Sequence, residues 1–565
     1  PMSATNAGAT STRTPTSGRQ GRSRGGTSLA GQPPYARPPE CTWFHSAPVR
    51  LHAVGPSGAG SHDQSVRTQD DRVRVLHVSR TLPQEMLGVM YLSRAVKDAG
   101  HEMKALFLPD PKWIGKFRDY SPDIVTWSAM TGIHQGILDV NRLLKAKFDF
   151  FSFMGGPHPS LVPEIVRDPD VDAVCIGEGE GALVDLCNAL QNGEEIRSIQ
   201  NLCFDDGEGG LIKNPLRPLV DIEEIGFPDR SVVYDAQPLY RNSQRKVVVT
   251  QRGCPMMCSF CFHHAWKGKL YGAKNSDYVR KRSVSHVIEE VEQIRSRYSL
   301  SFVHFLDDIF NLKDDWMEEF SERWPREVGL PFDAILMANM TTEDHIRQLK
   351  SAGCVYARIA FEAANDFVRN TVFRKNTQRE QLTNAAGWIK DYGIRLGSLN
   401  MLGGPGGTLE DDFDTIRLNV ECQVDQPIVS IVQPYPQFEL NDITKELGIA
   451  VDSYDDFPAK FNRSATIDVK DRMAVENLHK WFPLVVRQPR LMPLVRATVR
   501  CRWVRLPLLA AYMLFSQWQV AEHNALYNRC LGRRGWRTWR PVDFMGRVIE
   551  KAVVTVVATA GGKGI

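Results

Sequence analysis

What the 565-residue sequence lacks narrows the classes of protein that it can encode. No run approaches the roughly 20 consecutive apolar residues that a membrane-spanning helix needs. The net charge is only +3, which gives no argument for a nucleic-acid partner. The eleven cysteines are an odd number scattered over a long chain, whereas a secreted disulfide framework is shorter and denser. We therefore expect a cytoplasmic protein with more than one domain, because single cores stop growing at roughly 250–300 residues.

The first stretch of the chain also lacks acidic residues, since the first one is Glu40. Residues 1–70 are instead rich in Ser, Thr, Gly, Pro and Arg and hold few apolar side chains. So little apolar surface cannot offset the entropy of ordering the chain, which predicts a disordered tail. An organelle transit peptide has a similar composition and is the alternative.

Short apolar strands alternate with amphipathic helices between residues 71 and 200. Val73–Val78 has the pattern of a buried strand, and Met86–Ala99 has the pattern of an amphipathic helix. Further strands are expected at 104–108, 124–127, 151–154 and 173–176. This alternation predicts an α/β domain with a doubly wound parallel sheet that helices cover on both faces.

Polar residues and glycines follow the predicted strands of this first domain. Ligands of doubly wound sheets bind beyond the carboxyl ends of the strands, at the point where the strand order reverses. Glycines at such ends let a large flat or charged ligand approach the backbone closely. The candidate ligand contacts are Ser128, Thr131, Gly155, Gly156, His158, Gly177, Glu178 and Gly179.

A second alternating series follows a linker with a small strand pair, which we expect over residues 201–240. The predicted strands are 246–250, 302–306, 334–338, 356–361, 395–401 and 428–432, with helices between them. Six such units over residues 241–465 predict a partial TIM-type (β/α)6 barrel, whose active site would lie at the rim formed by the carboxyl ends of the strands.

The alternation stops in the last region of the chain, residues 466–565, which is rich in Arg and Trp. Within it, Trp503–Phe515 is mostly apolar but too short to span a bilayer. Two interpretations stay open: an interfacial or substrate-covering helical segment, or a helical subdomain that packs on the barrel.

The most specific feature is a group of three cysteines directly after the first barrel strand. The stretch TQRGCPMMCSFCF places Cys254, Cys258 and Cys261 within eight residues. Three thiolates on one loop can hold three irons of a [4Fe–4S] cubane, and the fourth iron is then open to chelate an amino acid. Structural zinc is the alternative, with His263 or His264 as a fourth ligand, although such sites usually have four ligands in two separated pairs.

This cysteine spacing at the end of a first barrel strand resembles the Cys-x-x-x-Cys-x-Phe-Cys signature of radical S-adenosylmethionine (radical SAM) enzymes. The resemblance covers roughly residues 246–435. It implies that the reduced cluster cleaves S-adenosylmethionine to methionine and a 5′-deoxyadenosyl radical, which takes hydrogen from an unactivated carbon.

The same resemblance implies which residues contact S-adenosylmethionine. Phe260 matches the aromatic residue near the adenine, and Asp307 or Asp308 matches the place that holds the methionine amino end. Glu362 would lie near the ribose. Arg358 lies four residues earlier in the same strand, should point to the same side, and could pair with the cofactor's carboxylate. An ion pair with a neighbouring carboxylate inside the barrel is the alternative for Arg358.

The first domain resembles the cobalamin-binding domain that precedes the barrel in one large branch of this family. The residues that carry the resemblance are Gly155–His158 and Val171–Glu180. The motif Asp-x-His-x-x-Gly, which offers a histidine as lower cobalt ligand in some cobalamin proteins, is absent. We therefore expect cobalamin without a ligand from that motif, and a histidine at position 158 is more typical of a hydrogen-bonding residue than of a cobalt ligand.

The leading functional hypothesis is methylation of an sp3 carbon, with cobalamin as the methyl donor and a second S-adenosylmethionine to remethylate it. A radical SAM oxidative cyclisation or rearrangement, of the type that builds the fifth ring of bacteriochlorophyll, is the first alternative. A non-catalytic Fe–S/cobalamin sensor is the second, although no output domain is visible. A tRNA methylthiotransferase would need a second group of cysteines, but Cys175 falls in a predicted strand and Cys187 in a predicted helix.

The expected partners are a small-molecule or lipid-like substrate and a reduced flavodoxin- or ferredoxin-type electron donor, with no nucleic acid. Peripheral membrane contact through the Arg- and Trp-rich region stays open. No residue beyond the cofactor sites receives a catalytic role from the sequence.

Overall fold

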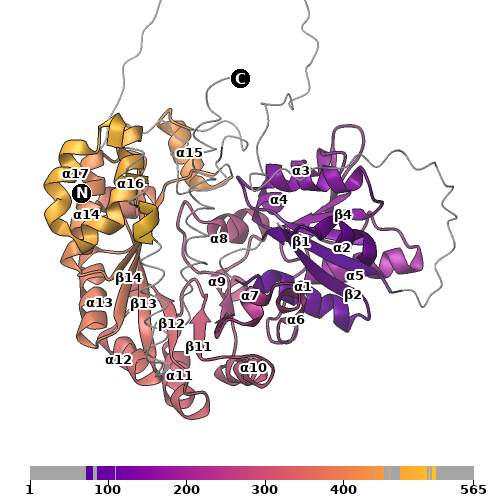
Figure 1. Ribbon diagram of the computed structural model, residues 1–565, viewed down its shortest axis with the longest axis horizontal. Helices are drawn as coiled ribbons and strands as arrows, with labels where there is room; N and C mark the ends of the chain where they lie inside the picture. Colours follow the sequence, from indigo (N-terminus) through magenta and orange to yellow (C-terminus); the bar gives the residue numbers. More distant parts are fainter. Residues whose placement is uncertain are drawn as a thin grey trace, which may run out of the picture. The chain divides into compact units, whose positions relative to one another are not determined.

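The computed structural model describes residues 72–80, 85–108, 110–435, 437–450, 457, 471–504, 508–509 and 512–516. The tail predicted over residues 1–70 lies outside the described residues, as do most residues after 504. Figure 1 shows two α/β units in the described chain, each built on a mainly parallel sheet. The fold class predicted from the sequence is therefore confirmed.

The first sheet has seven strands in the order β2-β1-β3-β4-β5-β6-β7. Its first five strands are mutually parallel and match the predicted strands to within two residues at each end: β1 (Arg74–Arg80), β2 (Glu102–Leu108), β3 (Ile124–Ser128), β4 (Phe151–Gly155) and β5 (Ala173–Cys175). The order reverses between β1 and β3, which is where a sheet of this type binds its ligand.

Helices cover both faces of this sheet because its strands are apolar on both sides. Val75 of β1 joins one core with residues of α1 (Leu87–Asp98) and α5 (Glu180–Asn192). Leu76, the next residue, joins a second core with residues of α2 (Trp113–Tyr120) and α3 (His134–Lys145). Successive side chains of a strand point to opposite faces, so a continuous apolar run requires a cover on each face.

The expected linker over residues 201–240 does contain a small strand pair, but this pair belongs to the first sheet. β6 (Leu202–Asp205) pairs antiparallel with β5, and β7 (Leu211–Lys213) pairs antiparallel with β6. Cys203 and Phe204 of β6 are buried and complete the two cores. Two short helices follow, α6 (Ser231–Tyr234) and α7 (Pro238–Arg241).

The second sheet is the predicted six-stranded partial barrel. Its strands are parallel in the order β15-β14-β13-β12-β11-β8 and lie within two residues of the predicted bounds. They are β8 (Arg245–Val248), β11 (Phe302–Phe305), β12 (Phe332–Leu336), β13 (Cys354–Glu362), β14 (Arg395–Leu402) and β15 (Gln426–Ile431). The helices that cover them are α10 (Val284–Arg297), α11 (Asp314–Glu327), α12 (Glu343–Ala352), α13 (Arg379–Asp391) and α14 (Leu409–Glu421).

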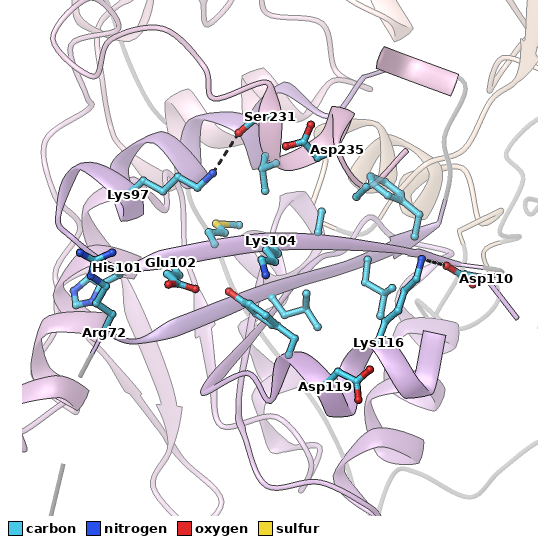
Figure 2. Close-up of a pocket in the computed structure, with 18 of the residues that line it drawn as sticks. Arg72, Lys97, His101, Glu102, Lys104, Asp110, Lys116, Asp119, Ser231 and Asp235 are labelled. Carbon is cyan, nitrogen blue, oxygen red and sulfur yellow. Dashed lines mark hydrogen bonds and ion pairs between the residues drawn. The ribbon is translucent and has the colours of Figure 1, made fainter. Parts of the chain in front are cut away.

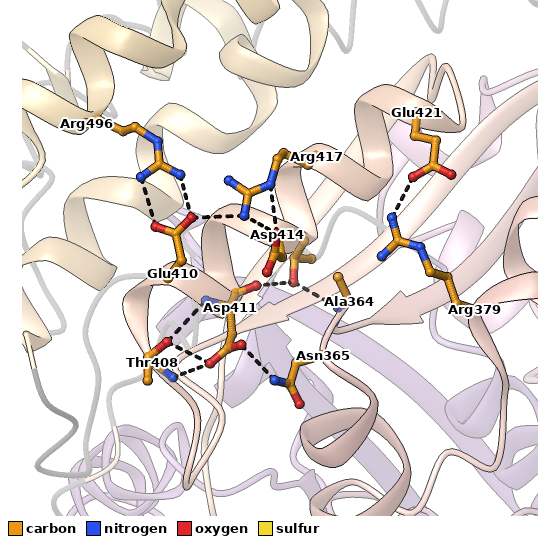
Figure 3. A network of polar contacts seen from close by, with 11 residues as sticks. Ala364, Asn365, Arg379, Thr408, Glu410, Asp411, Asp414, Arg417, Glu421 and Arg496 are labelled. Atoms are coloured by element: carbon orange, nitrogen blue, oxygen red, sulfur yellow. Dashed lines mark hydrogen bonds and ion pairs between the residues drawn. The ribbon is translucent and has the colours of Figure 1, made fainter.

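The described part of the C-terminal region packs on the barrel as a helical subdomain. It contains α16 (Arg472–Arg487) and α17 (Met492–Thr498), and Leu478 and Val495 belong to the barrel core. Figure 3 shows the polar side of this contact, where Arg496 of α17 donates two hydrogen bonds, of 2.6 and 2.8 Å, to Glu410 of α14. Within the described residues, no helix is both long enough and apolar enough to cross a membrane.

Candidate active site

The three cysteines lie on a loop that the barrel holds from both sides. The loop follows β9 (Gln251–Arg252), and its Gly253 has a positive φ of 88° with the Tyr278 carbonyl so near that an added Cβ would lie 2.3 Å from it. Further along, Ser259 donates from N to the Phe373 carbonyl (3.1 Å) and from Oγ to the Val372 carbonyl (2.6 Å). The loop is therefore fixed by backbone contacts before any metal binds.

The thiols of this loop fit an iron–sulfur cluster better than a single metal ion. Burial raises the pKa of Cys254 to about 11 and also raises the pKa values of Cys258 and Cys261, and the three thiols influence one another electrostatically. Yet among the described residues no three His, Cys, Asp or Glu side chains converge closely enough to hold one ion. A zinc ion needs its ligands about 2.0–2.3 Å away, whereas the sulfurs that hold a cubane stand further apart.

The two histidines considered for a zinc site differ in their contacts. His263 contacts the hydroxyl of Tyr278 through Nδ1 (2.8 Å) and the Asp308 carboxylate through Nε2 (2.8 Å). Both ring nitrogens of His263 therefore have partners already. His264 faces Glu439, with Nε2 3.7 Å from the carboxylate.

The two aspartates at the end of β11 have different environments. Asp307 is buried, and its carboxylate accepts hydrogen bonds from Thr250 N (2.7 Å), Thr250 Oγ1 (2.8 Å) and Gln251 N (3.1 Å). It therefore supports the start of the cysteine loop. The Asp308 side chain is 50% exposed and lies beside the same loop. Of the two predicted contacts for the methionine amino end, Asp308 is the one with free carboxylate surface.

Arg358 lies in the barrel interior, where it forms the ion pair with a neighbouring carboxylate that was the alternative interpretation of its sequence position. Its Nη2 is 3.3 Å from Asp333 Oδ1 and 3.3 Å from His304 Nδ1, and Asp333 also accepts a hydrogen bond from His304. Burial away from solvent lowers the pKa of His304 to about 4. A contact of Arg358 with the cofactor carboxylate stays a prediction.

Glu362 ends β13 in a backbone conformation that the strand pattern did not predict. A β-bulge between Ala360 and Glu362 interrupts the alternation, so the expectation that Arg358 and Glu362 point to one side does not follow from period two. Glu362 also has a positive φ of 59°, which is strained for a residue with a side chain and clusters at functional sites. Its carboxylate pairs with Lys375 Nζ at 3.0 Å.

Sequence reasoning missed Lys375. Its charge opposes the rise in pKa that burial causes at Cys254 and Cys258, so this cation lies within electrostatic reach of the thiols. Lys375 lies in an irregular loop between two residues with positive φ, Arg374 and Asn376. No periodicity or motif marks such a position in the sequence.

Phe260 packs with its ring edge-on against Phe373, at 5.4 Å between ring centroids, and stays partly exposed. Phe260 therefore offers an aromatic surface next to Cys261, and its contact with adenine stays a prediction. Met257 of the same loop is 47% exposed. The cysteine loop thus presents apolar as well as metal-binding groups.

Most ligand candidates of the first domain lie together at the carboxyl edge of its sheet. Ala129 N donates to the Gly155 carbonyl (2.8 Å), and His158 N donates to the Ala129 carbonyl (3.0 Å). Ser160, which the sequence did not single out, donates to the Gly156 carbonyl (2.9 Å) and accepts from Gly177 N (3.0 Å). These contacts bring the loops after β3, β4 and β5 together at one edge beside the switch point, where sheets of this type bind ligands.

His158 is part of the framework of that edge. Its ring is stacked on His134 at 3.9 Å between centroids, and its Nδ1 is 3.0 Å from Thr131 Oγ1. Burial lowers the pKa of His158 to about 3, so the imidazole is neutral. These contacts are those of a hydrogen-bonding residue, and the expectation that His158 does not ligate cobalt stays a prediction.

Glu178 differs from the other candidates because its carboxylate turns toward the cysteine-loop side. It contacts Arg252, Arg280 and the backbone NH of Val220 (2.9 Å). Burial alone would raise the pKa of Glu178, but the hydrogen bond from Arg280 and the charge of Arg252 outweigh it and lower that pKa. Gly179, the next residue, precedes α5 and packs against Cys175.

A pocket of about 1010 Å³ runs along the outer edge of β2 and lies apart from these groups (Figure 2). Its lining holds none of the cysteines and none of the ligand candidates. Two of its lysines contact other lining residues, since Lys97 donates a hydrogen bond to Ser231 and Lys116 pairs with Asp110. By its lining, this pocket is separate from the candidate site.

Comparisons with known proteins agree with this geometry. Residues 248–418 match the radical SAM superfamily, and residues 73–187 match the B12 binding domain. An uncharacterized methyltransferase of Pyrococcus horikoshii is 30% identical over 369 residues, which are 62% of this chain and 76% of that protein. The anaerobic magnesium-protoporphyrin IX monomethyl ester cyclase of Rubrivivax gelatinosus is 24% identical over 355 residues, which are 60% of this chain and 61% of the cyclase.

The fold is also that of a solved structure, the radical S-adenosylmethionine methyltransferase TsrM from Kitasatospora setae. The two chains superpose with a TM-score of 0.57 at 18% identity, over 68% of this chain and 80% of TsrM. Fold and site together define a two-domain enzyme with a barrel-borne iron–sulfur site. The chain belongs to the radical SAM superfamily, in the branch that carries a B12-binding domain. Its cofactors are accordingly a [4Fe–4S] cluster, S-adenosylmethionine and cobalamin.

Proposed function

We propose that this protein is a cobalamin-dependent radical SAM methyltransferase that methylates an unactivated carbon of a small organic molecule. The observation that carries the proposal is the pairing of two preformed loops in one chain, the cysteine loop of the barrel and the glycine-rich edge of the B12-binding domain. When bound, the cluster with S-adenosylmethionine supplies a carbon radical, and cobalamin supplies the methyl group.

The residues of this chain bind and orient those groups. We assign the cluster irons to Cys254, Cys258 and Cys261, and the amino end of S-adenosylmethionine to Asp308. Glu362 would accept from the ribose hydroxyls, while Lys375, a buried cation beside it, suits the carboxylate. On the first domain, the backbone of the loops after β3, β4 and β5 would hold the corrin, for which polar groups and glycines are suited.

The substrate that we propose is apolar. Met257 on the cysteine loop and Met130 at the edge of the B12-binding domain are 47% and 51% exposed, although methionine is normally buried. Phe367, which follows β13, is 54% exposed. Exposed flexible and aromatic apolar groups on carboxyl-end loops favour an apolar or lipid-like molecule over a charged one.

Contact with a membrane surface is the finer form of this proposal. Residues 487–516 contain six arginines and no acidic residue, and Trp503 is 87% exposed. Arginines beside an exposed tryptophan are typical of segments that lie at an anionic lipid surface. When anionic vesicles are sedimented, we expect more of the wild type than of Trp503→Ser in the vesicle pellet. Equal amounts of both proteins in the pellet would contradict this contact.

We also propose that the electron donor is a reduced flavodoxin- or ferredoxin-type protein.

The test of the main proposal is an anaerobic reconstitution with iron, sulfide, cobalamin and S-adenosylmethionine that carries an isotopically labelled methyl group. With a reductant and an apolar acceptor, we expect 5′-deoxyadenosine and a product that contains the label. No 5′-deoxyadenosine from protein with an intact cluster would contradict the radical step. A product that lacks the label would instead favour the cyclase alternative, which the relative from Rubrivivax gelatinosus supports.

A further inference from the structure

Two arginines face each other directly across a short strand pair next to the cysteine loop. β9 pairs antiparallel with β10 (Arg280–Lys281), and the register places Arg252 opposite Arg280. Their side chains are only 19% and 16% exposed. Like charges directly opposite each other destabilise a strand pair, and partial burial increases the repulsion. Such a pair persists only where a carboxylate lies between the two guanidinium groups.

Glu178 of the B12-binding domain supplies that carboxylate. Arg280 holds it with two parallel hydrogen bonds, Nη1 to Oε2 (2.9 Å) and Nη2 to Oε1 (2.8 Å). Arg252 donates to the same Oε1 at 3.3 Å, and its Nη2 donates to Glu180 at 2.7 Å. Two-point contacts between a guanidinium and a carboxylate fix orientation as well as distance.

The backbone of Glu178 is held from the same side. Its NH donates to the hydroxyl of Tyr271 at 3.1 Å, and an added Cβ at the preceding Gly177 would lie 2.1 Å from that hydroxyl. Both carboxylate oxygens of Glu178 accept hydrogen bonds from Arg280, and Oε2 also accepts one from Val220 N (2.9 Å). The residue has little capacity left for a corrin, although its neighbours Gly177 and Gly179 are candidates to line one.

The two loops that Glu178 joins are the two that the reaction needs. It lies between Gly177 and Gly179 on the loop after β5, and its partner Arg252 stands two residues before Cys254. The second partner, Arg280, follows Tyr278, whose hydroxyl holds His263. A shift of the carboxylate would therefore move the cysteine loop relative to the edge of the B12-binding domain.

We propose that Glu178 is a positioning residue that sets the cysteine loop in register with the cobalamin edge. It acts through Arg252 and Arg280 and does not itself touch a cofactor. The expected effect on product formation rests on the proposed function. The expected effect on the position of the cysteine loop does not, because it concerns the protein without cofactors. The relative position of the two cofactor sites would then depend on the charge of the Glu178 carboxylate.

The first test compares hydrogen–deuterium exchange in the full chain without cofactors. In Glu178→Gln we expect exchange over residues 250–262 to rise roughly tenfold, because Arg280 then loses its carboxylate and faces Arg252 with only the Glu180 charge to offset the repulsion. Arg280→Gln should change it much less, and the double variant should resemble Arg280→Gln. Glu164→Gln, on a 44% exposed surface pair of the same domain, is the control. Equal exchange in Glu178→Gln and wild type, or additive effects in the double variant, would overturn the proposal.

The second test separates alignment from folding in the loaded enzyme. Glu178→Gln should retain the cluster and release 5′-deoxyadenosine, but form roughly tenfold less methylated product per 5′-deoxyadenosine. Glu178→Asp, which keeps the charge, should recover part of that ratio. An unchanged ratio in Glu178→Gln would overturn the positioning role. If the wild type itself forms no methylated product, the proposed function fails while the exchange result still stands.

Discussion

Lys375 donates a hydrogen bond of 3.0 Å to Glu362 at the end of β13, and the two side chains are each 9% exposed. Glu362 reaches this contact with a left-handed backbone after a β-bulge. The pair acts electrostatically on the cysteine loop: Lys375 lowers the pKa of Cys254 and Cys258 against the effect of burial, and Glu362 raises that of Cys258. A buried cation in this place would stabilise the negative charge that a bound cluster gains on reduction.

Lys375→Met should therefore make the cluster harder to reduce. Loss of the cation leaves the Glu362 carboxylate unbalanced near the thiolates, and we expect the reduction potential to fall by tens of millivolts. Lys375→Arg keeps the charge and is the matched control. A redox titration followed by electron paramagnetic resonance measures both variants, and the same potential in Lys375→Met as in wild type would contradict the assignment.

Cys258→Ala should abolish the cluster. A cubane with three cysteine ligands loses one of them, so we expect iron and sulfide after anaerobic reconstitution to fall well below half of the wild-type content. Cys422→Ala is the control, since Cys422 is also buried but lies at the end of α14. Full iron content in Cys258→Ala would show that the loop does not bind the cluster.

Asp412 should make the stability of the barrel depend on pH. Burial raises its pKa to about 7, against the hydrogen bonds that Gly403 N donates to it, and Asp411 adds to the rise. Because the folded pKa lies above the ordinary value of 3.8, the stabilisation is complete below about pH 4 and is lost as pH rises through about 7. The difference corresponds to roughly 4 kcal/mol.

Asp412→Asn should remove this dependence. At about pH 8 the variant should unfold at higher urea than the wild type, and the difference between the two midpoints should shrink as pH falls and close below about pH 4. Asp414→Asn, on the exposed side of the same helix, should leave the pH dependence as it is. A wild-type midpoint that stays constant from about pH 5 to 8 would rule out the assignment.

Two arginines that each bind carboxylates should differ in their contribution to stability because their burial differs. Arg230 is buried and pairs with Glu85 (2.9 Å) and Glu290 (2.7 Å). Arg230→Met removes the positive charge that both buried carboxylates contact, so the free energy of unfolding should fall by about 3–5 kcal/mol. Arg496→Met removes an exposed pair with Glu410 and should cost at most about 1 kcal/mol. Thermal unfolding of both variants and the wild type measures these losses of stability. Losses of similar size in the two variants would contradict this ranking.

Local patterns predicted most of the fold. The strands of the barrel could be read within two residues because their apolar runs and flanking turns are properties of short segments. The strand pair β6 and β7 was expected within a linker and not as part of the first sheet, because the sequence of a short strand does not show which strand it pairs with. The bulge at Glu362 was missed for a similar reason, since it depends on the neighbouring strand.

By itself, the sequence determined the chemistry that this chain can support, because the spacing of Cys254, Cys258 and Cys261 is local and the thiols need only one loop. Tertiary structure alone decided how the charged candidates are used. Glu178 meets Arg280 across 102 residues of chain, and Arg358 meets Asp333 across 25. The physical reason is that a buried charge takes the nearest opposite charge that folding provides, and no local pattern records which residue that will be.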